Sequence, residues 1–416
     1  MRKMIDSGVE WLGAIPQDWD LVQIKSIASC KSEKSSYIGG AYIGLEHIES
    51  GSGKLLADGS QTGIEVDSTV SSFSDTDILF GKLRPYLAKA AKPNFDGQCS
   101  TEILVLNPSS RIQKDFLFWY LLNPAFIDAV NASTYGAKMP RANWNFIGSC
   151  YLPLPPMNMQ TVISSVLNEK FAQVDTLIAN VQAQIEKLKA YKQSVITEVV
   201  TKGLDPTVPM KNSGFEWIGE IPAHWEVKRG KVLFEESDAR SADGSEELLT
   251  VSQYTGITPR SQKNVNMFEA LTLEGYKICD VGDIAANTMW LWAGAIGVSA
   301  YSGVISPSYN VYRQKAENFV PGYLDCLLRA PMLVQEYASR STGIRASRLR
   351  LYPKDFLDIM FPVPPFGEQQ EIMRVLSDKF AAVDKLIAIK ESKIEKLEQY
   401  KKSLIYEYVT GKREVM

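Results

Sequence analysis

Two long stretches of this chain carry apolar residues at alternating spacings of four and three, which is the pattern of a coiled-coil helix. Each stretch follows a proline-rich break, at 153–156 in the first copy and at 362–365 in the second, so the copies lie 209 residues apart. The apolar positions are Leu167, Phe171, Val174, Ile178, Val181, Ile185 and Leu188 in the first copy, and Leu376, Phe380, Val383, Ile387, Ile394, Leu397 and Leu404 in the second. At about 1.5 Å of rise per residue, each stretch predicts a helix of roughly 60–68 Å.

Because both helices belong to one chain, we expect each to be the partner of the other, antiparallel and related by a pseudo-twofold axis. The alternative is that each helix only covers the core of its own domain. About five heptads exceed what a single small core can bury, which favours the paired arrangement.

A second repeated segment indicates that the duplication covers more than the helices. Residues 7–20 read "SGVEWLGAIPQDWD" and residues 213–226 read "SGFEWIGEIPAHWE", with eight identical positions at a separation of 206 residues. A period this long indicates tandem duplication of a whole domain-plus-helix unit. Two dissimilar stretches, about 21–151 and 227–360, lie between the repeated elements, and both predict mixed α/β structure.

The residue inventory argues against catalysis by this chain. Only two His are present and the five Cys are scattered without a CxxC pair, so we expect free thiols in a reducing cytoplasm and no His-based site. No apolar run is long enough to span a membrane. The chain has no NPPY- or DPPY-type motif for adenine methylation, and "GSGK" at 51–54 is interpreted as a turn because it lacks the flanking residues of a phosphate-binding loop. The acid pairs Asp75–Asp77 and Asp280–Asp283 precede apolar runs and are interpreted as strand-entry turns in preference to metal ligands.

Taken together and in order, the motifs of the chain resemble those of the specificity (S, HsdS) subunit of a type I restriction–modification enzyme over nearly the full length. The two tryptophan-containing openings at 11–19 and 217–225 belong to this pattern. The other matching motifs are "DILFGKLRPYL" at 77–87, "GDIAANTMW…GAIGVS" at 282–299, "ISPSYNVYR" at 305–313, "PLPPxxxQ" at 153–160 and "PVPPFGEQQ" at 362–370.

The resemblance implies a mixed α+β fold. Two globular α/β target recognition domains in pseudo-twofold arrangement would be separated by two long helices that form an antiparallel coiled coil. The implied segments are 1–151 for the first recognition domain, 152–203 for the first proline junction and helix, 204–212 for a linker, 213–360 for the second recognition domain and 361–416 for the second proline junction and helix.

The resemblance also implies a non-catalytic subunit of a multisubunit restriction endonuclease and adenine-N6 DNA methyltransferase. Each recognition domain would read one half of an asymmetric bipartite site in double-stranded DNA. The helices would set the gap and dock two methyltransferase (M) subunits, and motor-nuclease (R) subunits would join the full complex. No cofactor is expected on this chain, since S-adenosylmethionine, ATP and Mg would belong to the partner subunits. The implied location is the cytoplasm, with no membrane partner.

Contact with DNA requires local positive charge, because the net charge of the whole chain is −3. The segment 339–354 carries five cations around a glycine-containing turn, and 133–145 occupies the corresponding place in the first half. Arg pairs with guanine and Asn with adenine in the major groove. The candidates in these segments are Arg340, Arg345, Arg348 and Arg350 in the second half, and Lys138, Arg141 and Asn143 in the first.

A second pair of segments, 80–92 and 287–294, adds polar and aromatic candidates. These are Lys82, Arg84, Tyr86, Asn287 and Trp290. The alternative is that the aromatic residues belong to the core and that the two cations lie on an ordinary exposed strand. For the chain as a whole, a non-catalytic scaffold that binds protein or carbohydrate through exposed aromatics, with a coiled-coil spacer, remains an alternative function.

Overall fold

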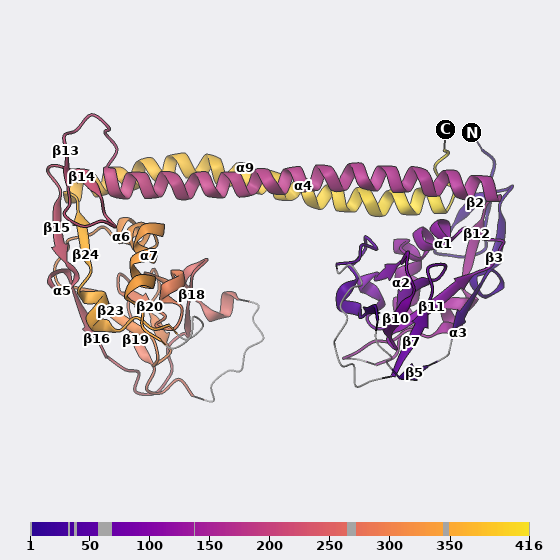
Figure 1. Ribbon diagram of the computed structural model, residues 1–416, viewed down its shortest axis with the longest axis horizontal. Coiled ribbons are helices and arrows are strands. Elements are labelled where there is room, and N and C mark those ends of the chain that lie inside the picture. The colour runs from indigo at the N-terminus through magenta and orange to yellow at the C-terminus, as the bar shows by residue number, and fades with distance from the viewer. Residues whose placement is uncertain are drawn as a thin grey trace. The chain divides into compact units, whose positions relative to one another are not determined.

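The computed structural model describes residues 2–31, 34–36, 40–56, 69–136, 138–263, 272–343 and 349–415. The chain forms two compact units: the first combines residues 1–182 with 390–416, and the second comprises 183–389. Two long helices, α4 (Met157–Lys202) and α9 (Phe366–Val409), contribute to both units (Figure 1). Both repeats of the sequence therefore supply residues to each unit.

The first unit contains two four-stranded sheets. Their strands are β4 (Ala28–Lys31), β5 (Ser35–Ser36), β6 (Tyr42–Ile43), β7 (Thr69–Phe73), β8 (Ile78–Gly81), β9 (Ala90–Ala91), β10 (Gly97–Ser100) and β11 (Ile103–Pro108). One sheet has the antiparallel order β4–β11–β8–β9. The other has the order β5–β7–β10–β6, in which β10 and β6 pair in parallel.

The second unit repeats the first of these sheets in the stretch whose sequence differs, and its other described strands there pair as two two-stranded sheets. Its strands are β16 (Phe234–Ser237), β17 (Leu249–Ser252), β18 (Gly256–Pro259), β19 (Lys277–Cys279), β20 (Ile284–Ala286), β21 (Ile296–Val298), β22 (Gly303–Ile305) and β23 (Asn310–Gln314). The sheet order β16–β23–β20–β21 matches that of the first unit strand for strand. The parallel bridge between Leu248 and Val304 beside β22 likewise matches the parallel pair β6–β10. The duplication therefore extends into the two dissimilar stretches, which share a fold.

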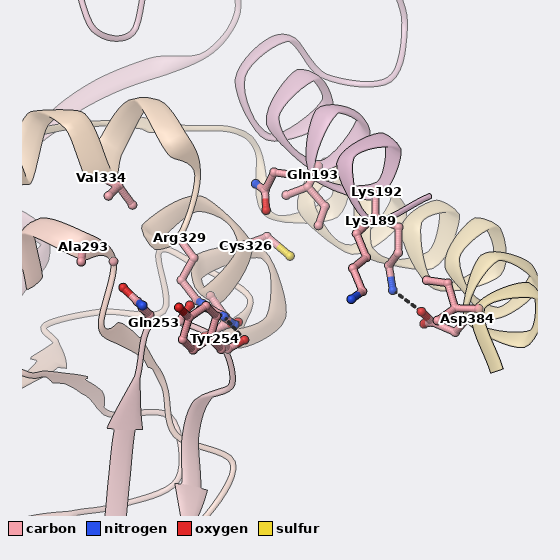
Figure 2. A pocket seen from close by; sticks show the side chains of 14 residues that line it. Lys189, Lys192, Gln193, Gln253, Tyr254, Ala293, Cys326, Arg329, Val334 and Asp384 are labelled. Carbon is pink, nitrogen blue, oxygen red and sulfur yellow. Dashed lines mark hydrogen bonds and ion pairs between the residues drawn. The ribbon is translucent and has the colours of Figure 1, made fainter. Parts of the chain in front are cut away.

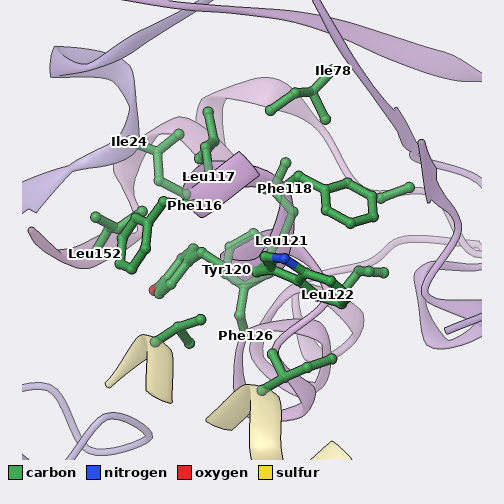
Figure 3. Packing of buried hydrophobic residues seen from close by; sticks show 14 of the residues in the cluster. Ile24, Ile78, Phe116, Leu117, Phe118, Tyr120, Leu121, Leu122, Phe126 and Leu152 are labelled. Atoms are coloured by element: carbon green, nitrogen blue, oxygen red, sulfur yellow. The ribbon is translucent and has the colours of Figure 1, made fainter. Parts of the chain in front are cut away.

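Three short helices follow the last of these strands in each unit and supply much of the core. They are α1 (Lys114–Leu121), α2 (Pro124–Ala132) and α3 (Trp144–Ser149) in the first unit, and α6 (Pro321–Leu328), α7 (Pro331–Arg340) and α8 (Pro353–Leu357) in the second. All residues from Phe116 to Leu121 are buried, which is why α1 is apolar on every side. Figure 3 shows Phe116 and Tyr120 of α1 packed in one cluster with Ile24, Ile78 and Leu152.

The repeated tryptophan segments form the same hairpin in both units. The remaining strands and short helices are β1 (Met4–Asp6), β2 (Ala14–Pro16), β3 (Asp20–Gln23), η1 (Ile24–Ser26), η2 (Leu45–His47), β12 (Tyr151–Leu154), β13 (Met210–Asn212), β14 (Glu220–Pro222), β15 (Glu226–Arg229), α5 (Gly230–Leu233), η4 (Arg260–Gln262) and β24 (Met360–Val363). The hairpins β1–β2 and β13–β14 each turn through two glycines with φ between +64° and +82°. The second tryptophan of each segment, Trp19 or Trp225, is buried in the core of its unit.

The proline junctions are also built alike. β12 pairs with β3 and β24 pairs with β15, and each proline-containing strand leads into a long helix. In the first turns of the helices, Gln160 and Gln369 are buried and make equivalent hydrogen bonds. Gln160 accepts from the Gln113 N–H at 2.8 Å, and Gln369 accepts from the Val320 N–H at 2.9 Å. Each glutamine thereby ties its helix to the start of the apolar helix that precedes it.

The two long helices pair in antiparallel orientation within each unit. In the first unit Lys401 of α9 forms an ion pair with Asp175 of α4 at 2.7 Å, and in the second Lys192 of α4 pairs with Asp384 of α9 at 2.5 Å. Higher numbers on one helix thus face lower numbers on the other. Leu404 and Ile405 also pack into the core of the first unit, so α9 does not cover only its own repeat. The predicted antiparallel pairing is confirmed.

In the described part of the chain, no helix combines the length and the apolar character that crossing a bilayer requires. The mixed α+β fold class is confirmed, whereas the five segment boundaries proposed from the sequence stay predictions.

Candidate nucleic-acid interface

The two candidate segments of the first unit lie against each other. The Arg84 N–H donates to the Pro140 carbonyl at 2.8 Å, and the Ala142 N–H donates to the Lys82 carbonyl at 2.9 Å. Leu83 and Arg141 form an antiparallel bridge between these two bonds. Residues 56–60 positions apart in the sequence therefore share one surface, which the sequence by itself did not predict.

The first of these segments, 80–92, contains a strained turn. The turn is the short helix η3 (Pro85–Leu87), which lies between Arg84 at φ +51° and Ala88 at φ +47°. Among the described non-glycine residues, only these two have positive φ, a conformation that costs about 1–2 kcal/mol per residue. Arg84 is exposed, and the Tyr86 ring is 52% exposed, so Tyr86 is not a core aromatic. Lys82 is half-buried.

The second segment is a closed loop. Tyr135 and Arg141 exchange backbone hydrogen bonds of 3.3 and 3.1 Å, and Lys138 is exposed near the tip between them. The Arg141 guanidinium binds Glu102 through both carboxylate oxygens, and this hydrogen bonding raises the pKa of Arg141. Arg141 is thus already paired within the unit.

Other side chains of the loop divide between structural and exposed positions. The Asn143 side chain accepts from the Phe146 N–H at 2.9 Å and caps α3, although the residue is exposed. Tyr135 and Met139 are 62% and 47% exposed, and the sequence analysis did not select them. Their position within a candidate loop was the available signal.

The second unit carries the equivalent turn with different chemistry. The short helix η5 (Leu291–Ala293) lies 206 residues after η3 and packs on α7, as η3 packs on α2. Its flanking residues are Trp290, which is 51% exposed, and Gly294, whose φ is +87°. Trp290 stacks on Trp292 with ring centroids 5.7 Å apart. The alternative that Trp290 is a core aromatic is therefore wrong.

Asn287 stands before this turn in a structural position. Its side chain is buried, and its amide donates to the Tyr309 hydroxyl at 2.9 Å. The Met289 N–H donates back to the Asn287 side-chain oxygen at 3.2 Å. Asn287 therefore orders the turn that carries Trp290.

The basic loop of the second unit is also closed at its base. Thr342 and Arg350 exchange backbone hydrogen bonds of 2.9 and 3.0 Å, as Tyr135 and Arg141 do in the first unit. Arg350 is exposed, while Arg340 is half-buried and pairs with Glu336 at 2.6 Å. Arg345 and Arg348 lie outside the described residues. The predicted correspondence of the two loops is confirmed by their shared position between α2 and α3, or α7 and α8.

The acid pairs close strand-entry turns, as predicted. The Asp77 carboxylate accepts from the Ser74 N–H at 2.7 Å and pairs with Lys31. Burial acts to raise the pKa of Asp77, but the hydrogen bonds from Lys31 and Ser74 outweigh it and lower the pKa. Asp283, 206 residues later, accepts from the Asp280 N–H at 2.9 Å and binds Arg313.

Comparison with known proteins identifies a family that this chain resembles. Residues 16–187 match the family described as type I restriction modification DNA specificity domain. The EcoDI specificity subunit of Escherichia coli is 27% identical over 55% of this chain, and the aligned part is 48% of that subunit, about half its length. The putative MjaX specificity subunit of Methanocaldococcus jannaschii is 25% identical over 96% of this chain and 95% of its own.

One solved structure has the same fold over most of the chain. It comes from work on complex assembly and conformational transition of the type I R-M system. That chain is 17% identical, with a TM-score of 0.68 over 96% of this chain and 99% of its own. The family resemblance indicated by the sequence motifs is confirmed.

Proposed function

Because the chain resembles the specificity subunits of type I restriction–modification enzymes, we propose that it is such a subunit and that it reads an asymmetric, bipartite site in double-stranded DNA. Each unit reads one half of the site. The paired helices set the unread gap and dock two methyltransferase subunits, and motor-nuclease subunits join these for cleavage.

One observation carries this proposal: the two units share a sheet order, and at equivalent positions they expose different side chains. The exposed residue before the short helix is Arg84 in the first unit and Trp290 in the second. A guanidinium and an indole recognise different base edges, because the first donates hydrogen bonds and the second makes mainly apolar contacts. Two equivalent units that expose unlike side chains support the proposal of a DNA site whose two halves differ.

The exposed charges support modest affinity for DNA by the isolated chain. Lys138, Arg84 and Arg350 are exposed, and no side-chain partner is recorded for them among the described residues. Arg141 and Arg340, by contrast, are held by carboxylates. With three exposed cations among the described candidate residues and a net charge of −3, the chain depends on its partner subunits for further phosphate contacts.

Two exposed apolar pairs on the helices support the docking of two copies of one partner. Leu177 and Leu386 are 48% and 47% exposed and lie 209 residues apart, as do Tyr191 and Tyr400, which are 51% and 42% exposed. The ion pairs Asp175–Lys401 and Lys192–Asp384 place Leu177 and Tyr400 at about the same level of the paired helices in the first unit, and Tyr191 and Leu386 in the second. Equivalent apolar patches of this kind are typical of interaction sites. The methyltransferase copies would supply S-adenosylmethionine and the methylation chemistry, while ATP and Mg would act on the motor subunits.

Methylome sequencing tests the proposed function directly. Cells that express this chain with an adenine methyltransferase subunit should methylate two short, unlike sequences separated by a constant gap. The Arg84→Trp variant should alter or abolish one half-site and leave the other unchanged. A palindromic motif, or methylation that does not depend on this chain, would contradict the proposal.

A further inference from the structure

The turn that carries Trp290 in the second unit has a packed base and an exposed side. At its base, Ala293 and Gly294 line one cavity together with Val334 of α7 (Figure 2). Val334 lies so close that a Cβ on Gly294 would come within 3.2 Å of its side chain. Met289 and Trp290, in contrast, are 39% and 51% exposed. The turn is therefore held against α7, and these two side chains form its accessible side.

The other polar side chains of the turn are already bonded within the unit. The Asn287 amide, the Thr288 hydroxyl and the Trp292 indole N–H each donate a hydrogen bond, at 2.9, 2.7 and 2.9 Å. The acceptors are, in the same order, the Tyr309 hydroxyl and the carbonyls of Ser308 and Met289. Within the described segment 287–292, the Trp290 indole N–H is the side-chain donor that remains for a ligand.

Trp292 also limits how the Trp290 ring can bind. The two rings stack with centroids 5.7 Å apart and an interplanar angle of 26°. Insertion of a ring between two stacked bases requires both of its faces, and one face of Trp290 is directed at Trp292. This contact disfavours the use of Trp290 as a wedge that unstacks a base step. The other face and the edge of the ring remain for contact with a base at the surface of a groove.

Thymine is the base whose major-groove edge best matches such a ring. It presents a C5-methyl group together with the O4 acceptor, so an apolar surface and one N–H donor can be used at once. Cytosine presents an amino donor, which cannot accept from the indole N–H, and adenine and guanine carry no methyl group.

The equivalent turn of the first unit provides a contrast. Arg84 stands at the place of Trp290 and is exposed. Its guanidinium carries several donors in a fixed arrangement and suits the two acceptors of guanine, not a methyl group. Recognition of a methyl group is therefore expected of the second unit and not of the first.

We propose that the turn at 287–292 recognises a thymine in the major groove through its C5-methyl group, which packs on the Trp290 ring. Met289 extends the apolar surface beside this ring. The inference rests on the proposed function, because it presumes that the second unit reads DNA. Trp290 is then a specificity-determining residue for one half-site.

Uracil tests this contact, because it pairs with adenine as thymine does and lacks only the methyl group. The full-length chain, assembled with the methyltransferase subunit, is titrated with duplexes that carry the site found by methylome sequencing. In each duplex one thymine of the site is replaced by deoxyuridine. The half-site that Arg84→Trp leaves unchanged is assigned to the second unit. We expect one replacement in that half-site to raise the dissociation constant about fourfold, as for loss of one buried methyl group.

Variants at Trp290 assign the effect to its side chain. Trp290→Ala should bind the thymine and uracil duplexes equally, whereas Trp290→Phe keeps an aromatic surface and should retain most of the preference for thymine. Tyr254→Ala is the matched control, because it removes another aromatic side chain of the same unit that is 81% exposed. This variant should keep the full preference.

Two results would overturn the inference. One is equal binding of the thymine and uracil duplexes by the original chain at every position of the half-site. The other is a preference for thymine that persists in Trp290→Ala. Thermal unfolding should show that Trp290→Ala folds; if it does not, Trp290→Arg, which introduces the residue of the first unit, replaces it in the same comparison.

The recognised sequence separates the inference from the proposed function. If methylation in cells shows no sequence that depends on this chain, the proposed function itself fails. If the complex recognises a bipartite site but no thymine methyl group contributes in the half-site of the second unit, only the inference fails.

Discussion

At the scale of single residues, the buried glutamines of the proline junctions show how a repeated motif stabilises a repeated fold. The Gln160 side chain accepts from one backbone N–H and donates to the carbonyls of Pro155 and Arg111. Gln369 makes the matching set with Val320, Pro364 and Asn318. A buried polar group that loses its partner costs about 1–3 kcal/mol, so these amides strongly constrain the junction.

We predict that Gln160→Leu lowers the free energy of unfolding by about 2–4 kcal/mol, because it leaves the Gln113 N–H and two carbonyls without partners. Urea denaturation followed by circular dichroism measures the loss. Gln173→Leu on the exposed face of the same helix is the matched control and should change stability by less than about 0.5 kcal/mol. Equal effects of the two variants would contradict the structural role given to Gln160.

Two substitutions in the turn at 84–88 distinguish the effect of backbone strain from the effect of the Arg84 side chain on DNA binding. Ala88 and Arg84 both adopt left-handed backbone, which glycine adopts at little cost. We predict that Ala88→Gly raises stability by about 0.5–1 kcal/mol and leaves DNA affinity unchanged, while Arg84→Gly relieves the same strain but weakens DNA binding at least tenfold. Thermal melts and fluorescence anisotropy of the methyltransferase complex with its DNA site measure both quantities. Weaker DNA binding by Ala88→Gly would indicate that the turn geometry, and not the Arg84 side chain, controls affinity.

At the scale of secondary-structure elements, the role proposed for the long helices depends on the register in which α4 and α9 pair. Their antiparallel pairing is set by heptad contacts and by one interhelical ion pair in each unit. Each helix contributes to the cores of both units, because Leu167 and Leu404 pack in the first and Val200 and Leu376 in the second. A change in length must therefore be made in both helices together.

We predict that inserting one heptad at matched positions in α4 and α9 lengthens the unread gap of the recognised site and preserves both half-sites. One heptad adds about 10 Å to each helix, which corresponds to about three base pairs of B-DNA. Methylome sequencing reads the new gap. An unchanged gap would refute the role of the helices as a ruler, and insertion in only one helix should instead destabilise the chain.

At the scale of the whole molecule, both chain ends belong to the first unit. The Arg2 N–H donates to the Glu414 carboxylate at 2.8 Å, and Lys412 donates to the Leu12 carbonyl at 2.6 Å. In the second unit, residues 203–209 connect the end of α4 to β13 at the equivalent place. Each unit therefore has a connection or a pair of chain ends at the equivalent place of its repeat.

We predict that a circular permutant retains the fold and the recognised site. In this variant a short linker joins residue 415 to residue 2, and new ends are placed within 204–209. Its thermal midpoint should lie within a few degrees of the original, because the contacts of both units are kept. Loss of the cooperative transition would show that the connection through 204–209 is itself required.

Local patterns in the sequence determined the long helices, their mutual pairing, the duplication of the tryptophan segments and the strand-entry turns. These features depend on residues a few positions apart, or on a repeat that can be read directly. The shared sheet order of the two dissimilar stretches was not predictable in the same way, since equivalent strands have different side chains.

Tertiary structure alone decided which candidate residues are available. Arg141 is occupied by Glu102, Asn287 is buried against Tyr309, and Trp290 is exposed on its turn. The physical reason is that burial and pairing depend on contacts between residues distant in the chain. The local periodicity of the sequence contains no information on such contacts.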